Sequence, residues 1–295
     1  EDGIRDLVRS RGLGDVYKRQ LLQNVDLRLY NPDSIAELKE ALGAYENISP
    51  NNITVSSGSE QLVDLITRIF LEKGDNAISV EPTFFMYDKR VKLNGANLVK
   101  VPLKEDLSLD IDAILEKITH TTKLLFICSP NNPTGNQFDL NELESLVDEC
   151  PAIVVIDEAY ADFADYSSVS LSTTKKNVIV LKTFSKAFGL AGMRFGYAVA
   201  NPDISSVLSE TIPYTVNIVT SKYVVKLLKD TSVIKTAIKQ VKAERKQLIT
   251  ELKALNGIEV FDSKANFVTF RPQENAEIIH KILLEKGIRT KNLGD

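Results

Sequence analysis

The sequence has few cysteines, no excess of positive charge and no long apolar run. Cys128 and Cys150 are the only cysteines among 295 residues, and they do not form a paired metal-ligand spacing. This usage is typical of buried thiols in a reducing compartment, and it predicts no metal site. Lys and Arg total 36 against 40 for Asp and Glu, which leaves no basic surface for nucleic acid. Because a membrane-length apolar run and a signal peptide are also missing, we expect a cytoplasmic protein without a membrane partner.

A Gly-x-Gly-x-x-Gly turn is absent after the first predicted strand, which argues against a dinucleotide-binding domain. From about residue 49, short β-branched runs alternate with longer amphipathic segments. This alternation predicts an α/β fold in which helices flank a mostly parallel seven-stranded sheet. The predicted strands are Ile53–Ser56, Ala77–Val80, Asn97–Val101, Leu124–Cys128, Ile153–Ile156, Val178–Thr183 and Phe195–Ala200. The predicted helices include Glu60–Glu72, Ile111–Ile118, Asn141–Cys150 and Ser232–Leu255.

The chain divides into four predicted segments. Residues 1–20 show no sustained apolar period and are expected to be an unmatched or non-native leader, and residues 21–48 an N-terminal arm. A large domain is expected over residues 49–225. A small α+β domain is expected over residues 226–295, with strands at Ile258–Phe261 and Asn266–Phe270 and a helix at Asn275–Lys286. Because the next residues, Gly287–Thr290, have the pattern of an incoming strand just before the chain ends, we expect the small domain to be incomplete.

Ligands in open parallel sheets bind at the carboxyl ends of the strands, so the residues after each predicted strand are the candidate site. The segment Ser57–Glu60 lies between a strand and a helix, where free N–H groups and the helix dipole favour an anion such as phosphate. A simple helix cap would explain the same residues. The segment Ser129–Gly135 reads Ser-Pro-Asn-Asn-Pro-Thr-Gly. A loop connection explains its prolines and glycine but not its paired amides, which favours a binding role.

Two further segments carry reactive groups. Asp157–Tyr160 places an acid at the end of a buried strand, where a protonated pyridine nitrogen would be a suitable partner. An Asp that caps the next helix is the structural alternative. Lys186 follows the sixth predicted strand, where partial desolvation would make its amine a nucleophile towards an aldehyde. Arg194 comes eight residues later, past two glycines, and can return to the same cavity to bind phosphate.

Together, Ser129–Gly135, Asp157–Tyr160 and Ser185–Gly196 resemble the class I/II aminotransferases of pyridoxal-5′-phosphate (PLP) fold type I. The resemblance extends from Leu29 to about Asp295 and is greatest to the histidinol-phosphate aminotransferases. It implies that Lys186 bonds to PLP and carries the proton of the substrate α-carbon. The other implied PLP contacts are Asp157 at the ring nitrogen, Tyr160 and Asn132 at the ring hydroxyl, Phe84 at the ring face, where the family more often has tyrosine, and Gly58, Ser59, Glu60, Ser185 and Arg194 at the phosphate.

The resemblance also implies a homodimer, in which Tyr30 reaches the phosphate of the neighbouring subunit's cofactor. An interface or core aromatic is the structural alternative for Tyr30. The implied reaction is transamination between L-histidinol phosphate as amino donor and 2-oxoglutarate as acceptor. The alternatives are threonine-phosphate decarboxylation, transamination of aromatic amino acids, and a noncatalytic fragment that keeps the fold.

Two departures from the family pattern concern substrate binding. An arm with an Asn-Glu-Asn-Pro-like segment normally precedes the Tyr30 motif, and residues 1–20 replace it. The late arginine that binds the substrate carboxylate would fall after Asp295. The resemblance therefore leads us to expect impaired substrate closure in this chain.

Overall fold

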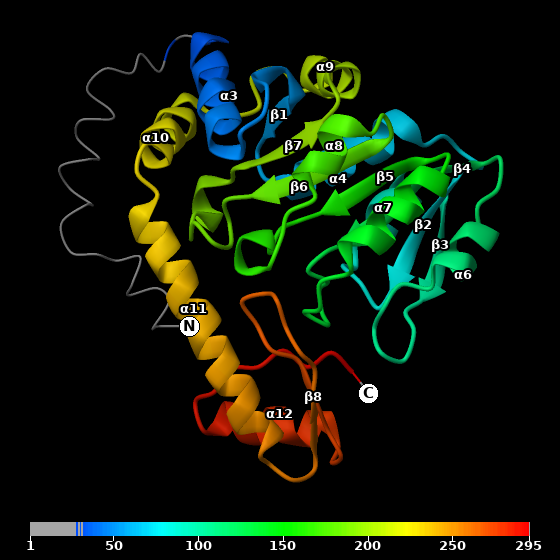
Figure 1. The fold of residues 1–295 in the computed structure, drawn as a ribbon, viewed down its shortest axis with the longest axis vertical. Coiled ribbons are helices and arrows are strands. Elements are labelled where there is room, and N and C mark those ends of the chain that lie inside the picture. The colour runs from blue at the N-terminus through cyan, green and yellow to red at the C-terminus, as the bar shows by residue number, and fades with distance from the viewer. Residues whose placement is uncertain (1–27, 29, 31, 295) are drawn as a thin grey trace.

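The computed structural model describes residues 28, 30 and 32–294 (Figure 1), so the predicted leader lies outside the described residues. A central sheet has seven strands in the order β1-β7-β6-β5-β4-β2-β3. Strands β2 to β6 pair in parallel, and β7 is antiparallel to both of its neighbours. The strands are β1 (Ile53–Ser56), β2 (Asn76–Glu81), β3 (Asn97–Pro102), β4 (Thr122–Cys128), β5 (Ile153–Asp157), β6 (Val178–Thr183) and β7 (Gly196–Ala200). The prediction of seven strands and an α/β fold is confirmed, with strand ends shifted by two residues or fewer.

Helices cover both faces of this sheet. The α-helices are α3 (Pro32–Glu46), α4 (Ser59–Phe70), α5 (Met86–Leu93), α6 (Ile111–Glu116), α7 (Leu140–Glu149), α8 (Val169–Thr174), α9 (Pro202–Thr211), α10 (Ile218–Leu228), α11 (Ser232–Lys253) and α12 (Ala276–Glu285). Short 3-10 helices are η1 (Pro50–Asn52), η2 (Ala161–Phe163) and η3 (Ala191–Met193). Within residues 32–294, none of these helices is both long enough and apolar enough to traverse a lipid bilayer.

The core has two layers because successive strand residues point to opposite faces. In β4, Leu125 and Ile127 pack in the cluster that contains residues of α3, α7 and α10. Leu124 and Phe126 pack in the other cluster, with residues of α4, α5 and α9. The continuous apolar runs of the sequence therefore reflect a sheet that is buried on both sides.

The C-terminal part is a smaller unit at the far end of α11 (Figure 1). In it, β8 (Ile258–Val260) pairs antiparallel with β9 (Phe270–Pro272), and α12 follows. The division between domains at residues 225 and 226 stays a prediction; those residues lie inside α10, and the next break between helices is at residues 229–231.

Two predicted strands of this unit are wrong. Residues 264–269 form a loop, so only Phe270 of the predicted strand Asn266–Phe270 is in a strand. The loop bonds to the large domain instead: the Lys264 N–H donates to the Gly135 carbonyl at 2.7 Å, and the Thr269 hydroxyl donates to the Pro133 carbonyl. Residues 288–290, in the predicted strand Gly287–Thr290, have no regular secondary structure.

The reversed strand β7 approaches the start of α4 very closely at Gly196. The register pairs Gly196 with Ser56 of β1 and with Thr183 of β6. A Cβ atom built on Gly196 would lie 2.5 Å from the backbone nitrogen of Ser59 and 2.9 Å from the Lys182 carbonyl oxygen. Only glycine allows β7 and the first turn of α4 to lie this close together.

We therefore expect the substitution G196A to lower the free energy of unfolding by about 1–3 kcal/mol, because backbone must move to admit the methyl group. Urea denaturation followed by circular dichroism would measure the change. G192A is the matched control, since a Cβ atom at Gly192 meets nothing within 4 Å; its effect should stay within about 0.5 kcal/mol. Equal stability of G196A and the wild type would contradict the close approach.

Candidate functional site

Asp157 is the centre of the candidate site. It is the last residue of β5, is 4% exposed, and accepts a hydrogen bond at Oδ2 from the Tyr87 hydroxyl at 2.9 Å. Its Oδ1 accepts from the Ala159 N–H at 3.1 Å. Burial raises the pKa of the Asp157 carboxyl, while the two hydrogen bonds and the charge of Lys186 oppose this rise. The capping alternative is not observed, because the residue before η2 is Tyr160 and no side chain caps that helix.

Lys186 lies in the turn after β6, at the same edge of the sheet as Asp157. Its Nζ atom is 5.3 Å from the centroid of the Tyr160 ring, and Tyr160 is 8% exposed. The structure thus brings Asp157, Tyr160 and Lys186 together. The expected desolvation of Lys186 is wrong, because the residue is exposed: it lies in the open turn beyond the strand and not among the buried strand residues.

A second group of predicted residues meets at the start of α4. Gly58 precedes the helix with φ +94°, and a Cβ atom built on it would lie 2.8 Å from Nη2 of Arg194. The Arg194 guanidinium therefore lies beside the first N–H groups of α4, where it adds positive charge to that of the helix dipole. The Glu60 carboxylate accepts a hydrogen bond from Arg90 Nη2 at 2.9 Å. The Glu60 side chain is therefore paired with Arg90 and does not belong to the group formed by Gly58 and Arg194. Only the backbone N–H of Glu60 is suited to an anion.

The two amides of the segment Ser129–Gly135 have different surroundings. Asn131 is buried; it donates to the Pro82 carbonyl at 2.8 Å and accepts from the Thr83 hydroxyl at 2.8 Å. Asn132 is half-buried, and among the described residues its side chain has no hydrogen-bond partner. Asn131 thus holds the loop, which leaves the Asn132 amide available for a ligand.

Phe84, Ser185 and Tyr30 occupy different places. Phe84 is half-buried, with its ring centroid 5.6 Å from that of Tyr87. Ser185, half-buried beside Lys186, donates its N–H to Thr183 Oγ1 at 3.2 Å. Tyr30 is 80% exposed, and its ring contacts Tyr214 at 4.9 Å. Among the described residues, none of the other predicted site residues contacts the Tyr30 ring or forms a hydrogen bond with Tyr30.

Sequence reasoning missed the partners that hold these residues. Tyr87 bonds to Asp157, and the Phe267 ring of the small unit packs edge-on against Tyr160 at 5.2 Å. At the start of α4, the Gln61 side chain accepts from the Ser57 N–H at 2.8 Å and from the Thr215 hydroxyl at 2.7 Å. For Tyr87 the only sequence signal was its place three residues after Phe84, at helical spacing.

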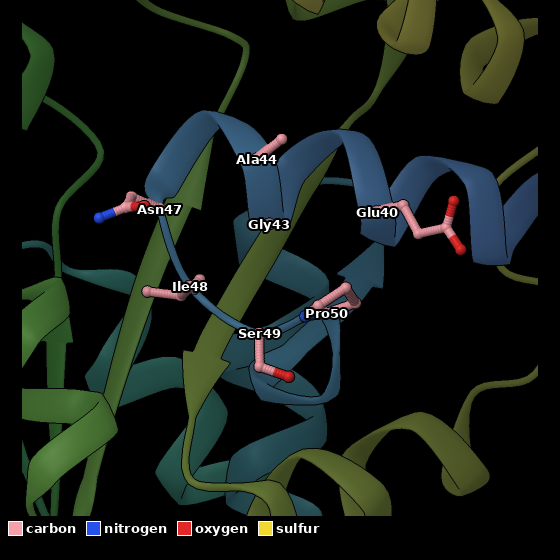
Figure 2. A pocket seen from close by; sticks show the side chains of 7 residues that line it. All are labelled: Glu40, Gly43, Ala44, Asn47, Ile48, Ser49 and Pro50. Carbon is pink, nitrogen blue, oxygen red and sulfur yellow. The ribbon is translucent and has the colours of Figure 1, made fainter.

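The hollow in Figure 2 is lined by Glu40, Gly43, Ala44, Asn47, Ile48, Ser49 and Pro50. It lies where α3 ends, and its lining includes none of the predicted site residues. The lining has no cationic side chain that would bind a phosphate. No group of three or more His, Cys, Asp or Glu side chains suited to a metal ion occurs in the described part of the chain. We therefore place the candidate site at the carboxyl edge of the sheet.

Solved structures show which class of fold this is. The structure of histidinol-phosphate aminotransferase from Sinorhizobium meliloti in complex with pyridoxal-5′-phosphate superposes with a TM-score of 0.84 at 24% identity, covering 94% of this chain and 77% of that one. L-threonine-O-3-phosphate decarboxylase from Porphyromonas gingivalis gives a TM-score of 0.79 at 23% identity, covering 95% and 85%. The fold is therefore the predicted PLP fold type I.

Sequence comparison then gives the family. The family model described as aminotransferase class I and II matches residues 15–292. Histidinol-phosphate aminotransferase of Caldanaerobacter subterraneus subsp. tengcongensis is 37% identical over 288 residues, which is 97% of this chain and 80% of that protein. The chain belongs to the aminotransferase class I and II family, as the motifs predicted.

A buried ion-pair network lies directly behind the candidate site. Lys182 of β6 has its Nζ atom 3.3 Å from the Glu158 carboxylate and 3.8 Å from that of Glu46, and the three side chains are 8%, 1% and 12% exposed. Burial lowers the pKa of Lys182, but the carboxylates of Glu158, Glu46 and Asp162 raise it by more, so the net shift is upward. Tyr197 donates its hydroxyl to Glu46. Lys182 therefore supplies a positive charge to carboxylates that are largely buried.

We expect K182M to lower the free energy of unfolding by about 3–5 kcal/mol, because it leaves buried carboxylates without a cation. K175M is the matched control: Lys175 Nζ lies 2.7 Å from Asp148, but that carboxylate is 54% exposed, so the loss should stay below about 1 kcal/mol. Urea denaturation of both variants would measure the difference. Equal losses would show that Lys182 is no more important for stability than a surface lysine.

Proposed function

We propose that this protein is a PLP-dependent transaminase that transfers the amino group of L-histidinol phosphate to 2-oxoglutarate. The observation that carries the proposal is the meeting of Lys186, Asp157 and Tyr160 at one edge of a sheet of this family's fold. The substrate is supported by relatives named histidinol-phosphate aminotransferase, 37% and 38% identical over 97% and 93% of the chain. This function would belong to histidine biosynthesis, in the cytoplasm.

The residues present fit PLP at two separate points. The Arg194 guanidinium lies close against Gly58 at the start of α4, since a Cβ atom built on Gly58 would be 2.8 Å from Nη2. This is the environment that a phosphate needs. Asp157 is a buried carboxylate whose hydrogen bonds in the described structure come from neutral donors, Tyr87 and the Ala159 N–H. A buried carboxylate of this kind suits a protonated ring nitrogen.

When bound, PLP supplies an aldehyde for covalent attachment and a conjugated ring that withdraws electrons. Lys186 would provide the amine that holds the aldehyde, with loss of water. Once the amine of the substrate displaces it, the freed Nζ atom would take the proton from the α-carbon. Asp157 would face the ring nitrogen and, when ionised, would favour its protonated form. The Tyr160 hydroxyl and the Asn132 amide would orient the ring hydroxyl, and Phe84 would cover one ring face. The phosphate contacts in this proposal are the N–H groups of Gly58, Ser59 and Glu60, the Ser185 hydroxyl and the Arg194 guanidinium.

The proposal includes a homodimer in which Tyr30 completes the site of the neighbouring subunit. Tyr30 and Tyr214 are 80% and 57% exposed and form an aromatic pair. Large aromatic rings in exposed pairs are typical of interfaces between subunits. The hydroxyl of Tyr30 would then donate to the phosphate of the partner's PLP.

A second candidate function is decarboxylation of threonine phosphate on the same scaffold. Its support is the decarboxylase fold match with a TM-score of 0.79. Both reactions use a lysine, a ring-nitrogen acid and a phosphate-bearing substrate, so these residues do not separate them. Transamination of aromatic amino acids and a noncatalytic protein that keeps the fold are the remaining alternatives. The names of the relatives at 37–38% identity favour the histidinol-phosphate reaction.

The cofactor assignment is tested by adding PLP, reducing with borohydride and mapping the modified peptide. We expect a new absorption band of lysine-bound PLP and a label on Lys186, because its exposed amine adjoins Tyr160 and Asp157. K186A should lose the label. K89A should keep it, since Lys89 is also an exposed lysine and lies over the Phe85 ring, 4.8 Å from its centroid. A label on other lysines only, in a folded protein, would overturn the assignment.

The substrate is tested by incubating the PLP-loaded protein with L-histidinol phosphate and 2-oxoglutarate. We expect glutamate to form in proportion to the amino donor consumed, with no CO₂ released. The control is O-phospho-L-threonine without a keto acid. Release of CO₂ from that compound would establish the decarboxylase instead. Glutamate formation from phenylalanine at a higher rate than from L-histidinol phosphate would favour the aromatic aminotransferase.

A further inference from the structure

Tyr87 is a buried tyrosine at the candidate site to which the proposed function gives no role. It lies in the first turn of α5, is 0% exposed, and donates its hydroxyl to Oδ2 of Asp157 at 2.9 Å. Asp157 is 70 residues away along the chain. This contact therefore exists only because α5 packs on the face of the sheet where the Asp157 side chain lies.

The ring of Tyr87 is held from two sides. It stacks on Phe126 of β4, with centroids 4.8 Å apart and an interplanar angle of 11°. The Phe84 ring meets it edge-on, at 5.6 Å and 83°. Aromatic contacts of this geometry hold a ring in place. One side chain thus supports both Phe84, which would cover the cofactor ring, and Asp157, which would face the ring nitrogen.

The phenol can act only as a neutral donor in this position. Burial and the nearby Asp157 carboxylate both raise the pKa of Tyr87 well above its ordinary value, so the hydroxyl keeps its proton. A hydrogen bond from a neutral donor stabilises the ionised carboxylate over the protonated one. Without it, burial would favour neutral Asp157, which cannot balance a protonated ring nitrogen.

We propose that Tyr87 is a positioning residue that keeps Asp157 ionised and aimed at the ring nitrogen of PLP. The inference rests on the proposed cofactor. It extends that proposal to a buried residue of α5 that would act on the cofactor through Asp157. Tyr87 would thereby help to set how strongly the ring withdraws electrons.

The test uses the whole protein loaded with PLP that carries ¹⁵N at the ring nitrogen. In Y87F, we expect the ¹⁵N resonance to move towards the position of neutral pyridine, because a more basic Asp157 takes a larger share of the proton. We also expect the dissociation constant of PLP, measured by equilibrium dialysis, to rise about tenfold, the usual effect of one lost hydrogen bond to a charged group.

Y197F is the matched control. Tyr197 is also a fully buried tyrosine whose hydroxyl donates to a carboxylate, that of Glu46. Its substitution removes the same atom from the core without touching Asp157. We expect Y197F to leave the ¹⁵N resonance and the dissociation constant unchanged. Equal effects in both variants would mean that Tyr87 acts through general stability, which would overturn the inference.

Failure of the inference and failure of the cofactor proposal give different results. If the wild type holds PLP on Lys186 while Y87F shows wild-type resonance and affinity, Tyr87 has no positioning role and the cofactor assignment stands. If the folded wild type takes up no PLP, both are overturned. In a D157N background, Y87F should cause no further change, because the group that it acts through is gone. A full further loss there would also overturn the inference.

Where Y87F does not fold, Tyr87→3-fluorotyrosine keeps the ring and the hydroxyl. We expect the ¹⁹F resonance of this residue to shift when PLP binds, since the partner of its hydroxyl gains a cationic neighbour. In D157N most of that shift should disappear. An equal shift in both backgrounds would overturn the inference.

Discussion

The reversed direction of β7 between β1 and β6 is the constraint on which the candidate site depends. The chain leaves β6 at the carboxyl edge of the sheet and re-enters the sheet at that same edge, because β7 runs back. Lys186 and Arg194 lie near the two ends of the segment that connects β6 to β7. Both residues are therefore at the edge of the sheet where β5 ends with Asp157. Gly196 removes the side chain that would keep the start of α4 away. The start of α4, Arg194, Lys186 and Asp157 are thereby brought to one edge of the sheet.

The alternation of side chains at the end of β5 places two adjacent acids, Asp157 and the following Glu158, on opposite faces of the sheet. Asp157 faces the layer of α4 and α5, where Tyr87 donates to it. Glu158 faces the opposite layer, where Lys182 and the hydroxyl of Ser167 meet it. A period of two residues thus places a carboxylate suited to a cofactor on one face and a carboxylate within a buried ion pair on the other. Since a buried charge requires a partner, the ion pair between Lys182 and Glu158 gives that carboxylate its own cation on the face opposite to Asp157.

The loop Ser129–Gly135 connects the site to the small C-terminal unit. On one side Asn131 fastens the loop to Pro82 and Thr83, near the start of α5. On the other side the small unit closes on it: a Cβ atom at Gly135 would lie 2.6 Å from the Ser263 hydroxyl, and Lys264 donates to the Gly135 carbonyl. Phe267 of the same unit touches Tyr160. A shift of the small unit would therefore act on Tyr160 and on the loop that carries Asn132, through these side-chain and backbone contacts.

The sequence by itself determined where the strands lie and which residues follow each strand, because apolar periodicity and turn chemistry are local properties. Local patterns are therefore sufficient to identify Asp157, Lys186, Arg194 and the segment Ser57–Glu60 as candidate site residues. The hydrogen-bond and ion-pair partners of the site residues were decided by the tertiary structure alone. Arg90 engages the Glu60 carboxylate, Tyr87 reaches Asp157 across 70 residues, and residues 264–269 form a loop on Pro133 and Gly135 where a strand was predicted. The exposure of Lys186 also differs from the prediction, since burial depends on what packs beyond a strand end. Hydrogen bonds and ion pairs between distant segments leave no periodic trace in the sequence, so only the packed fold reveals them.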